Sequence, residues 1–145
     1  MLQGSKYVQS DMSGVYDDIK SDIKSGKKVL FSGTPCQVAA VKSLCGTPDN
    51  LVLVEVICHG VPSQQLFTDY LKTFNNSSIE SFKFRIKESG WGLCAQLITE
   101  HSKKRIPCNI SSYYKMFLRC ETYRDSCYNC KYATKERVAD LTIGD

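Results

Sequence analysis

Residues 31–37 read FSGTPCQ, a stretch in which an apolar run gives way to a predicted helix. Its first residue ends an apolar run, KVLF over 28–31, that predicts a short buried strand. The glycine permits a tight turn, Thr34 is a favourable N-cap, and Pro35 suits the first position of a helix. The stretch therefore predicts a strand, a turn and a helix over 35–44 in immediate succession.

Cys36 falls in the first turn of this predicted helix. The backbone amides that a helix start leaves unpaired, together with the positive end of the helix dipole, favour a thiolate at this position. A thiolate there serves as a nucleophile, a redox thiol or a metal ligand. The positions of the other cysteines decide among these three roles.

A second apolar run, LVLVEVI over 51–57, is typical of a strand covered on both faces, as in a parallel sheet. Cys58 follows it directly, and an amphipathic helix is predicted over 61–74. Upstream, apolar residues at spacings of four predict a helix that starts near Ser13 and ends at Gly26. The first half therefore predicts a right-handed βαβ unit with parallel strands, preceded and followed by a helix.

The second half of the chain changes character, because apolar residues begin to alternate with polar ones. Strands are predicted over 79–87, 93–100 and 104–108, the last two as a hairpin, followed by a helix over 111–119 and a final strand over 138–143. The fold class is therefore predicted to be α/β, with a parallel βαβ core and an added antiparallel hairpin in one mixed sheet. Residues 1–145 are expected to form a single domain.

Composition sets limits on the class of protein. The chain has 145 residues, of which 42% are hydrophobic, and a net charge of +4, which is ordinary for a globular domain. Lys and Arg are scattered, so nucleic-acid binding is not predicted. No apolar run reaches the roughly 18–20 residues that span a bilayer, and residues 1–6 lack the apolar core of a signal peptide. A cytoplasmic protein without a membrane span is expected.

Eight cysteines are many for this length, and without a signal peptide they favour metal or redox chemistry over disulfides. Cys127 and Cys130 form a CxxC pair. Cys36 and Cys58 each follow a predicted parallel strand, so both are expected at the carboxyl edge of one sheet. These four thiolates suffice for a 4Fe-4S cluster or for a four-cysteine zinc site, and the residues alone leave both open.

The remaining candidates carry weaker signals. Cys45, Cys94 and Cys108 have apolar neighbours, which favours a packing role. Cys120 lies near the CxxC pair and is the substitute if one of the four predicted ligands is wrong. His59 fits a proton donor, a neighbour of the metal site or a surface residue. The CxxC pair alone also fits a dithiol oxidoreductase, and no catalytic residue is assigned.

Five short motifs follow one another along the chain: SKYVQS at 5–10, GTPCQ at 33–37, CHGVPS at 58–63, RDSCYNC at 124–130 and DLTIGD at 140–145. In this order they resemble the coenzyme F420 hydrogenase/dehydrogenase beta-subunit family, in its C-terminal domain. The resemblance covers essentially the whole chain. Because members of that family usually carry more sequence, the chain is expected to be a fragment of a longer member.

The resemblance implies an iron–sulfur flavoprotein oxidoreductase subunit that transfers electrons between a hydride-carrying cofactor or substrate and a 4Fe-4S cluster. It implies FAD as a second cofactor, and it places the cluster on Cys36, Cys58, Cys127 and Cys130. The expected partners are a redox partner subunit or ferredoxin-like domain and a small-molecule electron carrier. The alternatives are a zinc-stabilised interaction module without enzymatic activity and a CxxC dithiol oxidoreductase. The residues expected near the cofactors are Lys6, Gln9, Gly33, Thr34, Pro35, Gln37 and His59.

Overall fold

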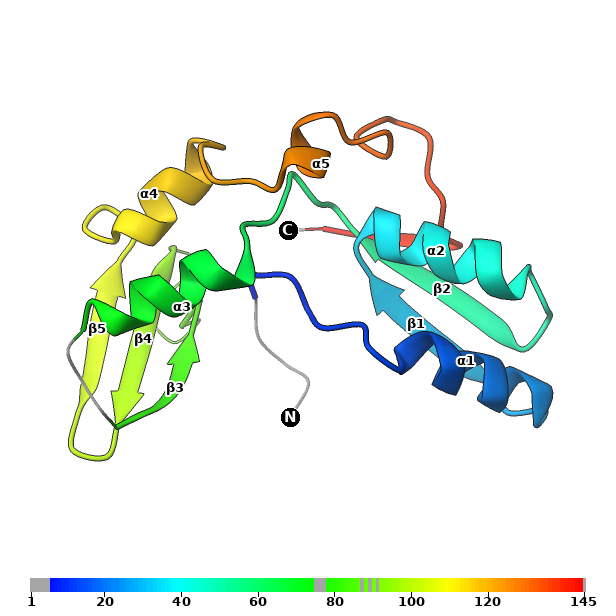
Figure 1. The fold of residues 1–145 in the computed structure, drawn as a ribbon, viewed down its shortest axis with the longest axis horizontal. Coiled ribbons are helices and arrows are strands. Elements are labelled where there is room, and N and C mark those ends of the chain that lie inside the picture. The colour runs from blue at the N-terminus through cyan, green and yellow to red at the C-terminus, as the bar shows by residue number, and fades with distance from the viewer. Residues whose placement is uncertain (1–5, 75–77, 87, 89, 91, 145) are drawn as a thin grey trace. The chain divides into compact units, whose positions relative to one another are not determined.

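The structure is a computed structural model, and it describes residues 6–74, 78–86, 88, 90 and 92–144 (Figure 1). Its helices are α1 (Val15–Lys24), α2 (Pro35–Cys45), α3 (Gln64–Lys72), α4 (Ser112–Leu118) and α5 (Asp125–Tyr128). Its strands are β1 (Val29–Gly33), β2 (Leu51–Val56), β3 (Ile79–Lys83), β4 (Cys94–Thr99), β5 (Lys103–Pro107) and β6 (Leu141–Ile143). Every helix among the described residues is too short or too polar to cross a lipid bilayer.

The chain folds into two compact units, each with its own sheet and its own core. Unit 1 comprises Met1–Gln9 and Gly60–Tyr128, and unit 2 comprises Ser10–His59 and Asn129–Asp145. Each unit is therefore assembled from two segments that are far apart in the sequence. A single domain over residues 1–145 stays a prediction.

A parallel sheet in the order β1-β2-β6 forms the frame of unit 2. The central strand β2 pairs with β1 on one side, where Gly33 lies opposite Glu55, and with β6 on the other, where Val56 lies opposite Ile143. β-Branched and large apolar residues fill these strands, as suits a pleated surface, and β2 is largely buried whereas Leu30 on β1 and all of β6 are exposed. The predicted βαβ unit is confirmed, because β1, α2 and β2 follow one another and the two strands are parallel.

Two helices complete the core of unit 2. α2 begins at Pro35, whose missing N–H costs nothing in the first turn of a helix. After α1, Gly26 adopts φ +77°, a conformation that glycine takes without strain and that commonly ends helices. The core consists of buried side chains from both helices and from alternate positions of β1 and β2: Ile19, Phe31, Val38, Val41, Leu51 and Leu53.

An antiparallel sheet in the order β3-β4-β5 forms the frame of unit 1, with α3 and α4 contributing to the same core. The buried hydroxyl groups in this core are hydrogen-bonded: Tyr113 donates to the backbone oxygen of Tyr7, and Tyr114 to that of Phe84. Burial raises the pKa of both Tyr113 and Tyr114 well above the ordinary tyrosine value, so both hydroxyls stay protonated. The buried residues of the core are Tyr70, Phe84, Ala95, Leu97, Ile106, Tyr113 and Tyr114.

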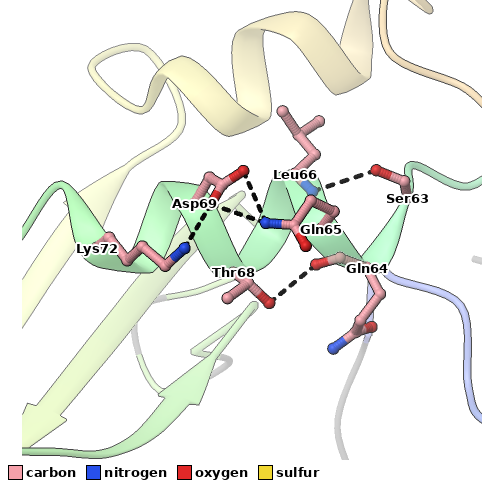
Figure 2. Close-up of polar contacts among 7 residues, drawn as sticks. All are labelled: Ser63, Gln64, Gln65, Leu66, Thr68, Asp69 and Lys72. Carbon is pink, nitrogen blue, oxygen red and sulfur yellow. Dashed lines mark hydrogen bonds and ion pairs between the residues drawn. The ribbon is translucent and has the colours of Figure 1, made fainter.

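Side-chain contacts along α3 explain where this helix begins and what steadies its outer face (Figure 2). The Ser63 hydroxyl caps the helix by accepting a hydrogen bond from the Leu66 N–H at 3.2 Å. In the last turn of the helix, Nζ of Lys72 donates to the carboxylate of Asp69 at 2.8 Å, and this bond lowers the pKa of Asp69. Nε2 of Gln65 donates to the same carboxylate.

The predicted α/β fold, with a parallel βαβ core and an added antiparallel part, is confirmed. The described strands form two separate sheets, however, in place of the expected single mixed sheet. β1 and β6 occupy both edges of β2, so no edge of that strand is open to the antiparallel strands. The strand expected over 79–87 ends at Lys83, and the CxxC segment begins with α5, which was not predicted. Ser5, Lys87 and Asp145, which belong to predicted elements or motifs, lie outside the described residues.

Candidate functional site

Cys36 and Cys58 emerge at the same edge of the parallel sheet in unit 2. Gly33 lies opposite Glu55 in the register of β1 and β2. Each cysteine lies three residues beyond one member of that pair, Cys36 in the first turn of α2 and Cys58 just past the end of β2. Both cysteines therefore lie beyond the carboxyl ends of their strands, where open α/β sheets bind ligands.

The start of α2 sets the surroundings of Cys36. The Thr34 hydroxyl lies 3.1 Å from Sγ of Cys36, within hydrogen-bonding distance for sulfur. The Thr34 N–H donates to Oε1 of Gln37 at 2.9 Å, and Nε2 of Gln37 donates to the Ser10 hydroxyl at 3.1 Å. The side chain of Gln37 therefore caps the N-terminus of α2, as in a capping box. Cys36 itself is exposed, in the first turn of α2 and beside the Thr34 hydroxyl.

Glu55 on β2 is a functional candidate that the sequence motifs missed. Its side chain is 0% exposed. Oε1 accepts a hydrogen bond from Oγ1 of Thr142 at 3.0 Å and lies 3.7 Å from Nη1 of Arg137. Oε2 accepts from the Val138 N–H at 3.4 Å. The signal that could have revealed it is a single carboxylate in the otherwise apolar run 51–57, because a buried charge requires partners.

Further hydrogen bonds attach the same C-terminal segment to unit 2. Nζ of Lys42 donates to the Val138 carbonyl at 2.9 Å. The Leu53 N–H donates to Oδ2 of Asp140 at 2.8 Å, and the Asp140 N–H donates back to the Leu53 carbonyl at 3.0 Å. The segment that follows Cys130 is thus held on β2, the strand that leads to Cys58.

Replacing this buried carboxylate by an amide tests its anchoring role. We expect Glu55→Gln to lower the free energy of unfolding by about 1–2 kcal/mol, because the amide has one acceptor oxygen and turns an NH₂ group toward donors. The effect is modest since the side chain of Arg137 is 37% exposed and water screens the ion pair. Urea denaturation followed by circular dichroism measures the change. Glu136→Gln, at an exposed glutamate nearby, is the matched control and should shift stability by no more than about 0.5 kcal/mol.

In unit 1, the chain that follows β2 pairs with the chain that leads into the CxxC motif. Pro62 forms an antiparallel bridge with Tyr123, and the Arg124 N–H donates to the Val61 carbonyl at 3.1 Å. The helix α5 begins at the next residue, and the Cys127 N–H donates to the Arg124 carbonyl at 2.8 Å. This pairing fixes the start of the CxxC segment.

The four predicted cluster ligands are divided between the units: Cys36, Cys58 and Cys130 belong to unit 2, and Cys127 belongs to unit 1. All eight cysteines lie among the described residues, and none is joined in a disulfide. Within that described part, the structure brings no three His, Cys, Asp or Glu side chains together as a ready metal site. The ligand assignment therefore stays a prediction.

The residues expected near the cofactors are divided in the same way. A Cβ on Gly33 would lie 3.0 Å from the ring of Phe31, so close packing within the protein already accounts for this glycine. The side chains of Thr34 and Gln37 contact each other at the helix start. Their roles toward a cofactor stay predictions. Unit 1 contains Lys6 and Gln9, and unit 2 contains Gly33, Thr34, Pro35, Gln37 and His59.

A comparison with protein families supplies the deciding observation. The family model that describes the C terminus of the coenzyme F420 hydrogenase/dehydrogenase beta subunit matches residues 26–145. The chain belongs to this family. A search of the curated proteins finds no match. The resemblance read from the motifs is thereby confirmed.

The match to the F420 hydrogenase/dehydrogenase beta-subunit family includes some of the predicted site residues and leaves others out. The match includes all four cysteines predicted as cluster ligands, and it begins after Lys6 and Gln9, which therefore gain no support from it. Hydrogenases and dehydrogenases are oxidoreductases, so a place in a redox enzyme fits this family. A subunit of such an enzyme also works with redox partners.

Proposed function

We propose that this chain is the iron–sulfur electron-transfer part of an oxidoreductase subunit, with Cys36, Cys58, Cys127 and Cys130 as the ligands of one 4Fe-4S cluster. When bound, such a cluster carries one electron at a time to or from a neighbouring redox centre. The electron partner is a redox subunit or a ferredoxin-like domain. FAD and a small-molecule hydride carrier belong to the proposal through the family resemblance alone.

The observation that carries the proposal is the anchoring of both flanks of the CxxC segment. Its upstream flank, residues 123–124, pairs with residues 61–62 inside unit 1. Its downstream flank, residues 137–142, is attached to Glu55 and its strand inside unit 2. The two anchor points lie on either side of Cys58 in the sequence. Tying the CxxC segment at both ends to the chain around Cys58 supports a ligand set shared by these cysteines and Cys36.

The chemistry of the donor set also supports an iron–sulfur cluster. Cysteine thiolates are its usual ligands, and these four thiols are outside disulfides and at least partly exposed. The Thr34 hydroxyl donates to Oε1 of Gln37 at 3.0 Å and lies 3.1 Å from Sγ of Cys36, so rotating its O–H would let it donate to a ligating sulfur instead. Such hydrogen bonds raise the reduction potential of a cluster by stabilising the added negative charge. The residues expected around FAD offer no comparable support.

Iron and acid-labile sulfide in the full chain, purified without oxygen, test the proposal. We expect about four irons and about four sulfides per chain, with a spin-resonance signal after chemical reduction. A colourless protein that holds one zinc ion would contradict the proposal and support the zinc-stabilised interaction module. A metal-free protein with a reversible disulfide between Cys127 and Cys130 would support the dithiol oxidoreductase instead.

A further inference from the structure

Positive charge is concentrated in one of the two units. Counted over the sequence, unit 1 holds eleven Lys and Arg against six Asp and Glu, a balance of +5. Unit 2 holds eight against nine, a balance of −1. The chain's net charge of +4 is therefore the sum of one basic unit and one nearly neutral unit.

The register of the antiparallel sheet brings part of this charge onto one face. Gln96 on the central strand β4 lies opposite Lys83 on β3 and opposite Arg105 on β5. In the next row, Ile98 lies opposite Ser81 and Lys103. Directly opposite residues share a face and lie about 5 Å apart at Cβ, so these two rows form one continuous surface.

This surface is the side of the sheet away from the core of unit 1. The residues that alternate with it, among them Phe82, Leu97 and Ile106, belong to the core that α3 and α4 help to form. Lys83, Lys103 and Arg105 are exposed, whereas Gln96 and Ile98 on the central strand are half-buried. We call the surface formed by Ser81, Lys83, Gln96, Ile98, Lys103 and Arg105 the basic sheet face.

The cations of the basic sheet face are not neutralised within the described part of the chain. The ion pairs found there involve other basic residues, such as Lys27, Lys72 and Arg137. Lys83, Lys103 and Arg105 make none with a described carboxylate. Three like charges on neighbouring strands repel one another, and an acidic surface would relieve that repulsion.

We propose that the basic sheet face docks an acidic surface of a partner protein. Charge complementarity of this kind steers encounter and sets register between proteins. The half-buried Ile98 at the centre and the cations around it match the usual pattern of an apolar interface core with a polar rim. The inference does not depend on the metal site, because it rests on unit 1 strands that carry no predicted ligand.

The composition of the face favours a protein over a nucleic acid. Sheets that bind single-stranded nucleic acid present aromatic side chains on which bases stack. The six residues of the basic sheet face include no aromatic one, and Phe82, the one aromatic residue within β3, β4 and β5, packs against the core on the other side of the sheet. Its cations alone would offer phosphate contacts without a stacking platform.

Binding of poly-L-glutamate to the full chain, measured by fluorescence anisotropy, tests this inference. We expect salt-sensitive binding that weakens about tenfold or more in the triple variant Lys83→Glu, Lys103→Glu, Arg105→Glu, because three attractive pairs become repulsive. The matched control is Lys28→Glu, Lys115→Glu, Lys135→Glu, which changes the net charge equally at exposed lysines that are not among the six residues of the face. It should retain most of the affinity.

Other outcomes would overturn the inference. An equal loss of binding in the two triple variants would show that net charge, and not this face, attracts the polyanion. Tighter binding of a single-stranded RNA of matched charge, lost in the same face variant, would assign the face to nucleic acid. Should the charge reversals prevent folding, the neutral set K83Q, K103Q and R105Q replaces them, and unchanged binding by that folded set would also contradict the proposal.

Discussion

A Cys58→Ser variant purified without oxygen is expected to lose its iron, with a content at least about tenfold below that of the unchanged chain. Serine keeps the shape of the side chain but replaces the thiolate by a hydroxyl group, a much poorer ligand for iron at neutral pH. Cys58 is the ligand whose replacement tests the shared site most directly. Its position at the sheet edge is set by β2, and the two residues or ranges that anchor the CxxC segment, Glu55 and 61–62, flank it in the sequence. Iron, acid-labile sulfide and visible absorbance report the outcome.

Matched cysteines in the same chain provide the controls. Cys45 packs against the core of unit 2, and Cys108 packs against the core of unit 1. Serine at either position should leave the iron content unchanged, although it removes one thiol from the same total. If Cys120→Ser removes iron while Cys127→Ser does not, the ligand set contains Cys120 and the assignment of Cys127 is wrong. Retention of iron by Cys58→Ser would contradict the shared site altogether.

A Gly60→Ala variant is expected to lower the free energy of unfolding by about 3–5 kcal/mol, through two separate effects. Gly60 has φ +127°, a conformation that residues with a Cβ rarely adopt. An added Cβ would also lie 2.4 Å from the ring of Tyr123, closer than carbon atoms can approach. Because both groups belong to unit 1, the effect should appear as an earlier urea transition of that unit by circular dichroism.

A double-mutant cycle separates the two causes of this destabilisation. With Tyr123→Leu as background, the clash is relieved while the backbone strain remains, so Gly60→Ala should cost roughly half as much there. Gly92→Ala is the control, because nothing lies within 4 Å of its added Cβ and its φ is not in the left-handed region. That substitution should be neutral or slightly stabilising, by up to about 1 kcal/mol. Equal costs at Gly60 in both backgrounds would rule out the clash.

The elements with strong local signals were predicted correctly from the sequence. Apolar runs place β1 and β2, and Thr34 and Pro35 place the start of α2, as the structure has them, except that β1 continues through Gly33, where a turn was predicted. Other boundaries were less accurate. The helix α3 begins only after the Ser63 cap, and β3 ends at Lys83. Element ends depend on caps and on strand partners, which periodicity does not report.

The candidate site was predicted in part. The positions of Cys36 and Cys58 at one sheet edge follow from a strand-helix-strand order that has essentially one handedness, so the sequence suffices for them. Glu55 was missed because its partners, Arg137, Val138 and Thr142, are more than eighty residues away. The part that Gln37 plays in capping α2 was missed although Thr34 and Gln37 have the local spacing of a capping box, whereas the bond from Gln37 to Ser10 joins residues 27 positions apart.

Local patterns in the sequence therefore suffice to predict the α/β class, the parallel βαβ core, the edge that carries Cys36 and Cys58, and the family. These features depend on periodicity, capping and short motifs, which are local. Three further features are seen only in the folded chain: β6 completes the parallel sheet, the antiparallel strands form a sheet of their own, and residues 61–62 and Glu55 anchor the CxxC segment. These features depend on pairing between segments far apart in the chain, and such pairing is chosen by the whole fold rather than by any local signal.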